Sequence, residues 1–105
     1  MKTRQLGNSE LHLTTVGIGT WAIGGGDWAF GWGDQDQESA IEGIIAGVDL
    51  GINWIDTAAV YGAGASEVLV GKALAKMEPS CRPLVATKCG RINREDGTVF
   101  GRITK

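Results

Sequence analysis

An acid, a phenol and an amine stand out as side chains that can do chemistry together: Asp56, Tyr61 and Lys88. Asp56 and Lys88 follow apolar stretches at the expected ends of two strands, and Tyr61 lies in the loop after Asp56. Neighbouring parallel strands are about 4.8 Å apart, so side chains at their carboxyl ends can touch. Because a buried lysine is costly without a partner, we expect Lys88 to pair with Asp56.

A phenol beside that amine has a recognised use in catalysis. The pKa of tyrosine is ordinarily about 10, and an adjacent ammonium favours the phenolate and lowers that pKa. Asp56 would orient the ammonium and keep it charged. Proton donation from Tyr61 to an oxygen is the chemistry of carbonyl reduction. Spacing alone leaves a second interpretation open, a structural ion pair near an unrelated surface tyrosine.

The elements that must position these residues begin with extended segments. A hairpin is expected over residues 3–13, because the turn residues Gly7-Asn8-Ser9 separate two short extended stretches. Three apolar stretches then predict strands, at residues 16–19, 53–56 and 84–88.

Helical periodicity lies between these strands. Apolar residues repeat at i, i+3, i+4 spacing over residues 37–50 and 66–76, with Asp36 and Ser66 as the predicted N-caps. Alternation of strand and helix means right-handed βαβ units with parallel pairing. Residues 89–105 have neither period and predict a loop or tail. The expected fold class is therefore α/β with a parallel sheet.

Composition narrows the classes of function. Ten Lys and Arg against twelve Asp and Glu give a formal net charge of −2, which predicts no nucleic-acid partner. No stretch approaches the roughly 18 apolar residues of a membrane span, so no membrane association is expected. Cys81 and Cys89 lack CxxC spacing, which favours reduced thiols in the cytoplasm over a disulfide or a metal site.

The glycines allow one competing architecture, a Rossmann dinucleotide site. Gly17-x-Gly19-x-x-Ala22 follows a strand as that motif requires, but a long loop rich in Gly and Trp separates it from the next helix. Asp56 comes 37 residues after Gly19, whereas the ribose ligand of that fold comes about 20 residues on. A (β/α)₈ barrel needs on the order of 250 residues, so three strands fit only an incomplete barrel.

Four segments together resemble the aldo-keto reductase family: Gly17-Ile18-Gly19-Thr20-Trp21, Asn53-Trp54-Ile55-Asp56-Thr57-Ala58-x-x-Tyr61-Gly62, Ser66-Glu67 and Ala86-Thr87-Lys88. The resemblance covers about residues 3–90. It implies a (β/α)₈ barrel closed at its base by the hairpin, with residues 1–105 as the N-terminal part of that single domain. It also implies bound NADPH and hydride transfer to an aldehyde or ketone.

Roles for individual residues come with that resemblance. Tyr61 would be the proton donor, Lys88 its pKa partner and Asp56 the residue that orients Lys88. The residues implied beside the cofactor are Gly19, Thr20, Trp21 and Asp56. Those implied beside the carbonyl substrate are Trp21, Trp28, Trp32 and Tyr61.

The sequence departs from the family pattern in one respect, because it stops after the third strand. The family's fourth catalytic residue is a histidine after the fourth strand, whereas His12 lies in the predicted hairpin and is expected to be structural. We therefore expect the 105 residues to be an N-terminal fragment that is inactive alone. Two alternatives stay open: a non-catalytic reductase-like module that binds a nucleotide or a partner, and a fragment that assembles through its edges without a biochemical role.

An incomplete barrel also predicts unsatisfied surfaces. A three-stranded sheet cut from a barrel exposes its inward face and two unpaired edges. We expect self-association, or dependence on the missing C-terminal barrel segment.

Overall fold

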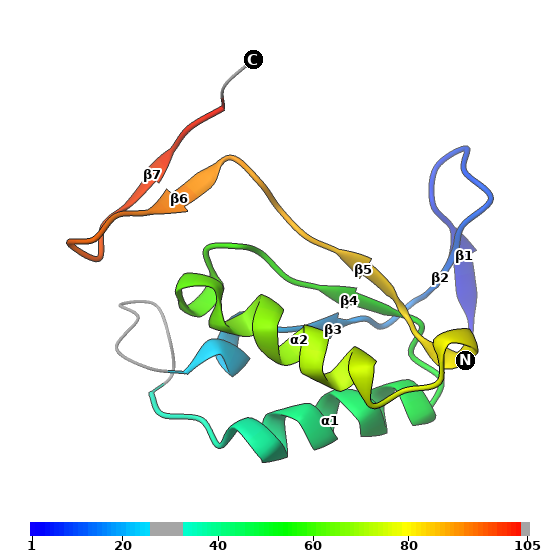
Figure 1. Ribbon diagram of the computed structural model, residues 1–105. Coiled ribbons are helices and arrows are strands. Elements are labelled where there is room, and N and C mark those ends of the chain that lie inside the picture. The colour runs from blue at the N-terminus through cyan, green and yellow to red at the C-terminus, as the bar shows by residue number, and fades with distance from the viewer. Residues whose placement is uncertain (26–32, 104–105) are drawn as a thin grey trace.

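Three parallel strands form the centre of the computed structural model, which describes residues 1–25 and 33–103 (Figure 1). They lie in the order β3 (Ile18–Gly19), β4 (Trp54–Asp56) and β5 (Leu84–Ala86). Ile55 pairs with Ile18 on one side and with Val85 on the other. The predicted parallel sheet is confirmed, with strands shorter than expected: Lys88 lies two residues beyond the end of β5.

The predicted hairpin is also present. Strands β1 (Thr3–Gln5) and β2 (His12–Thr14) pair antiparallel. The side chain of Asn53, just before β4, accepts from the Thr14 amide at 2.9 Å and donates to the His12 carbonyl at 2.8 Å. These bonds hold the hairpin at the amino end of the sheet, opposite the end that carries Asp56.

Helix α1 (Gln37–Asp49) begins and ends as its sequence predicts. The Asp36 carboxylate accepts from the Ser39 amide at 2.8 Å and caps the first turn. At the other end Gly51 has a φ of 97°, and its amide donates to the Val48 carbonyl. The Ile52 amide reaches back to Gly47, so the helix ends in a Schellman motif.

Helix α2 (Ala65–Ala75) corrects one prediction, that Ser66 is an N-cap. The cap is Gly64, and Ser66 lies inside the first turn with its hydroxyl buried. The chain enters this helix through left-handed conformations at Gly62, Ala63 and Gly64. That turn starts the helix earlier than the apolar pattern indicates.

Both helices cover the same face of the sheet (Figure 1). The core between them consists of apolar side chains from α1, β4 and α2: Ile41, Ile44, Ile55, Leu69, Val70 and Ala73. Strand β5 pairs only with β4, and Leu84 and Val85 are 41% and 43% exposed. Among the described residues the sheet therefore keeps an open edge at β5. No described helix has the length and apolar character to cross a bilayer.

The expectation of a loop or tail over residues 89–105 is wrong for its central part. Strands β6 (Arg91–Asn93) and β7 (Val99–Gly101) form a second antiparallel hairpin. Asp96 accepts from the Thr98 amide at 2.9 Å and shapes its turn. Residues 89–105 are polar and interrupted by glycine, so no apolar stretch marks these two strands in the sequence.

Three short 3₁₀ turns complete the described chain: η1 (Trp21–Gly24), η2 (Tyr61–Gly64) and η3 (Pro79–Cys81).

Gly17 packs directly on the indole of Trp54. A Cβ at Gly17 would lie 2.3 Å from two ring atoms, and the indole Nε1 donates to the Thr14 carbonyl at 2.9 Å. We expect Gly17→Ala to displace the ring and lower the free energy of unfolding by about 1–3 kcal/mol, measured by urea denaturation. Gly43→Ala in α1 is the control, because its Cβ meets nothing within 4 Å and alanine favours helix by up to about 1 kcal/mol. Equal stability of the two variants would contradict this packing.

Candidate active site

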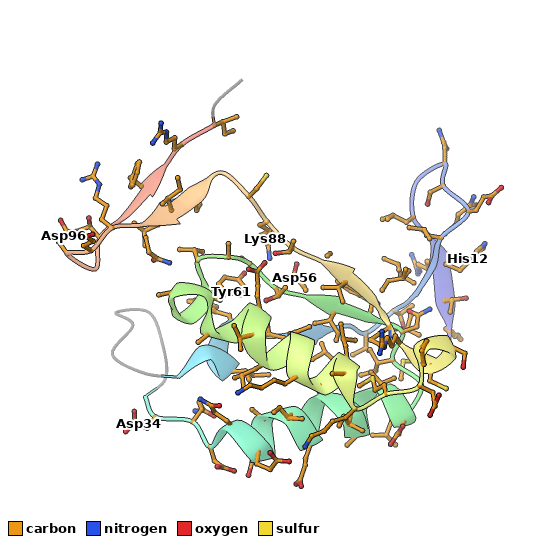
Figure 2. The ribbon with its side chains drawn as sticks, in the orientation of Figure 1. His12, Asp34, Asp56, Tyr61, Lys88 and Asp96 are labelled. Atoms are coloured by element: carbon orange, nitrogen blue, oxygen red, sulfur yellow. The ribbon has the colours of Figure 1, made fainter. Side chains whose placement is uncertain are left out.

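The ammonium of Lys88 gathers the residues that the sequence singled out (Figure 2). Its Nζ donates to both carboxylate oxygens of Asp56 at 2.8 Å each and to the phenol oxygen of Tyr61 at 3.1 Å. A further bond, 3.0 Å long, goes to the backbone carbonyl of Thr57. Asp56, Tyr61 and Lys88 therefore form one cluster, as their places at the strand ends predicted.

Strand geometry explains why these groups meet. Asp56 is the last residue of β4 and pairs in register with Ala86, the last residue of β5. The Thr57 amide extends that pairing by donating to the Ala86 carbonyl at 2.8 Å. Lys88 follows two residues later, so its long side chain can turn back over the end of β4.

Electrostatics keep the ammonium charged. Partial burial lowers the pKa of Lys88, but the hydrogen bonds to Asp56 and Tyr61 and the electrostatic attraction of these two groups together outweigh it, so the pKa lies above its ordinary 10.5. Half of the Lys88 side chain and 37% of the Asp56 side chain are exposed, so water screens this pair and a ligand can reach it.

Tyr61 sits at the start of a strained turn. Gly62 has a φ of 56°, and Ala63, with a φ of 53°, is the one non-glycine residue with positive φ in the described ranges 1–25 and 33–103. Such a conformation costs alanine on the order of 1–2 kcal/mol, and strain of this kind clusters at functional sites. A Cβ on Gly62 would come within 2.8 Å of the Gly24 backbone. The Tyr61 turn is thus pressed against η1, which begins with Trp21.

Three buried hydroxyls lie behind the cluster, and two of them, those of Thr57 and Ser66, are not among the predicted site residues. Thr20, Thr57 and Ser66 are each at most 1% exposed. The Ser66 Oγ lies 2.7 Å from Thr20 Oγ1 and 3.2 Å from Thr57 Oγ1. The sequence does show polar residues among apolar ones at these positions. It does not show which hydroxyl groups contact one another.

The residues predicted to lie beside a cofactor differ in whether they are exposed or buried. Gly19 ends β3 in register with Asp56, is exposed, and has no atom of the described residues within 4 Å of a Cβ position. Trp21 is 51% exposed on η1. Thr20, in contrast, is fully buried, and both its amide and its hydroxyl donate to the Asp56 carbonyl. Its side chain therefore supports Asp56 and offers no surface to a ligand.

The remaining predicted substrate residues, Trp28 and Trp32, lie outside the described residues.

His12 is far from the cluster, on the hairpin at the other end of the sheet (Figure 2). Across 1–25 and 33–103 no three His, Cys, Asp or Glu side chains gather as a metal site requires. Cys81 and Cys89 are free and exposed.

The arrangement can hold a proton at a defined atom. An ammonium has donors only, so the Tyr61 oxygen accepts from Lys88 and directs its own hydrogen elsewhere. Negative charge that develops on that oxygen is stabilised by a cation 3.1 Å away. Open space beside Gly19, at the same end of the sheet, allows a flat ring to approach the backbone closely.

Comparisons with known proteins identify related sequences and structures. The profile of the Aldo/keto reductase family matches residues 15–102. The NADH-specific methylglyoxal reductase of Escherichia coli (strain K12) is 43% identical over 103 residues, which are 98% of this chain and 31% of that protein. An aldo-keto reductase of Bacillus subtilis (strain 168) is 40% identical over 88 residues, or 84% of this chain and 25% of that one.

Solved structures give the same result. An aldo-keto reductase from Bacillus halodurans in its holo form superposes with a TM-score of 0.72 at 35% identity, covering 96% of this chain and 30% of that chain. Glycerol dehydrogenase from Gluconobacter oxydans superposes with a TM-score of 0.73 at 40% identity, with the same coverage. The chain thus spans about a third of the length of these relatives, and its elements correspond to the hairpin, the first three strands and two helices of their (β/α)₈ barrel.

Proposed function

The chain belongs to the aldo/keto reductase family, and from that premise we propose that it supplies the proton donor of a nicotinamide-dependent carbonyl reductase. The observation that carries the proposal is the position of the Lys88 ammonium, bonded to Asp56 and Tyr61 together. The substrate class is a small aldehyde or ketone, which the reaction converts into an alcohol.

Each residue of the cluster has a separate task in this reaction. Tyr61 donates its hydroxyl proton to the substrate oxygen as that oxygen gains charge. Lys88 stabilises the phenolate left behind, and Asp56 fixes the ammonium with two bonds of 2.8 Å. Water can return a proton to Tyr61, because the cluster is half-exposed.

The carbon half of the reaction needs a second reagent. A bound reduced nicotinamide would supply the hydride that the carbonyl carbon accepts. Gly19 and Trp21 are the described residues that fit beside it, because one leaves open space at the strand end and the other is an exposed aromatic on the adjoining turn. Asp56 borders the same space through its register with Gly19.

Which nicotinamide cofactor is bound, NADH or NADPH, is a separate question. Aldo/keto reductases use NADH or NADPH. Our expectation of NADPH came from the family resemblance, whereas the Escherichia coli relative is by its name NADH-specific. Turnover is therefore compared with NADH and with NADPH.

A non-catalytic module that binds a nucleotide or a partner is the alternative. The observation behind it is the ion pair of Lys88 and Asp56, which would serve a structural role as well as a catalytic one. We also propose a cytoplasmic location, supported by two exposed cysteines that remain unpaired.

A chimera tests the proposed function. Residues 1–105 replace the matching 31% of the Escherichia coli methylglyoxal reductase, whose remaining segment should then cover the open edge of β5. We expect the chimera to oxidise NADH or NADPH when methylglyoxal is added, and the 105-residue chain alone to show no turnover. A folded chimera that binds a nicotinamide without turnover would support the non-catalytic module and contradict the proposal.

A further inference from the structure

We propose that Ser66 is a positioning residue for Lys88, acting through the buried hydroxyl of Thr57 and the backbone carbonyl next to it. The inference rests on the proposed function for its catalytic consequence, and on the contacts of Ser66 for its structural one. Ser66 touches neither Lys88 nor Tyr61 in the bonds described above. Its effect must pass through the residues to which it is bonded.

The first step is the environment of the Ser66 hydroxyl. It lies within hydrogen-bond distance of three oxygens: Thr20 Oγ1 at 2.7 Å, Thr20 O at 2.9 Å and Thr57 Oγ1 at 3.2 Å. Ser66 and Thr20 are 0% exposed and Thr57 is 1% exposed. Water does not replace a lost partner at such a depth, so the hydroxyls of Thr20 and Thr57 depend on Ser66 for these bonds.

The second step joins these hydroxyls to the acceptors of Lys88. The Thr57 carbonyl accepts from Lys88 Nζ at 3.0 Å. The Thr20 amide and hydroxyl both donate to the Asp56 carbonyl, at 3.0 Å and 3.2 Å. The hydroxyl cluster therefore fixes the backbone of residues 56 and 57, which carry three of the four oxygens bonded to the ammonium.

The third step concerns Tyr61, which provides the fourth oxygen. Ser66 lies in the first turn of α2, directly after the left-handed turn that begins at Tyr61. The Ser66 bonds to Thr20 and Thr57 anchor that helix end to the residues that directly follow β3 and β4. The Ser66 hydroxyl therefore lies between the turn that begins at Tyr61 and the segment of residues 56 and 57. The distance between these two segments determines whether Lys88 can contact both of them.

A purely structural role for Ser66 makes a different prediction. If the hydroxyl only anchors α2, its loss lowers stability and leaves the ammonium and its pH dependence unchanged. Thr14 provides a matched control, because it is also buried, at 5% exposure, and its hydroxyl donates to the Val16 carbonyl at 2.6 Å. It lies at the amino end of the sheet, remote from Lys88, so Thr14→Val removes a buried hydroxyl without touching the Lys88 contacts.

Two measurements on Ser66→Ala test the proposal. Nitrogen-15 NMR of the Lys88 Nζ in the full 105-residue chain should show a lower titration midpoint than in the unmodified chain, because its acceptors are less well placed. In the chimera, kcat should fall about tenfold with KM within twofold, an effect of about one hydrogen bond. Thr14→Val should show neither change.

The outcomes separate this inference from the proposed function. An unmodified chimera without turnover contradicts the proposed function. The NMR titration still shows whether Ser66 positions Lys88. An unchanged Lys88 midpoint in Ser66→Ala overturns the positioning role, whatever the activity. If Ser66→Ala does not fold, Thr57→Val removes the same hydroxyl contact from the other side, and an unchanged midpoint there overturns the role equally.

Discussion

Replacing Tyr61 with phenylalanine in the chimera is expected to lower kcat/KM for methylglyoxal by about 10²–10⁴-fold, the usual contribution of a positioned general acid. The change removes one oxygen and keeps the ring. Lys88 Nζ lies 4.9 Å from the ring centroid, so the phenylalanine ring can still face the ammonium, and Asp56 still holds it. The loss should therefore report the missing proton and not a collapsed site.

Steady-state kinetics at saturating nicotinamide, with methylglyoxal varied, are the measurement for Tyr61→Phe. Nicotinamide affinity, measured by fluorescence titration, should stay within twofold. Retention of more than a tenth of the unmodified turnover would exclude Tyr61 as the proton donor. That result would leave the ion pair of Lys88 and Asp56 with a structural role only, the second interpretation that the spacing left open.

Lys88→Met is expected to lower kcat by about 10²–10³-fold, the range for loss of one preorganised donor at a developing charge. Methionine keeps much of the length of lysine without its charge, so the phenolate of Tyr61 forms without a cation beside it. The carboxylate of Asp56 also loses both of its bonds to Nζ. Lys72→Met is the matched control, because Lys72 lies on the surface of α2 and donates to Gln37 at 3.1 Å.

The pH dependence of stability provides an independent readout for Lys88. Its pKa is raised above 10.5 in the fold, so the ammonium contributes stability that is fully present below about pH 10.5. That contribution is lost as the pH rises through the raised pKa. Denaturant midpoints of the 105-residue chain at pH 8 and above pH 11 should therefore fall more for the unmodified chain than for Lys88→Met. Equal falls would show that the pair with Asp56 adds nothing to folding.

The sequence was informative where local patterns determine the structure. Asp56 and Lys88 each follow a short apolar strand, and the register of parallel strands then brings them together without further information. Helix α1 was equally accessible, because Asp36 and Gly51 mark its two ends by their own chemistry. These features depend on neighbours in the sequence or on a regular strand spacing.

Other features depend on contacts between distant residues, which no local pattern records. Ser66 reads as an N-cap because serine often caps helices, yet its hydroxyl bonds to Thr20, 46 residues away. The left-handed conformation of Ala63 is imposed by the packing of η2 on η1, since alanine itself disfavours it. The burial of Thr20 likewise depends on contacts with distant residues and cannot be read from its position in the motif.

The acceptors of Lys88 all precede it in the chain, between Asp56 and Tyr61, and Asp56 is 32 residues away. A genetic crossover downstream of Lys88 therefore transfers donor, cation and carboxylate to a new gene as one inherited block. In barrel enzymes, loops after later strands also shape substrate choice. On the proposed function, recombination at this point would exchange the loops that shape substrate choice and leave the proton donor unchanged.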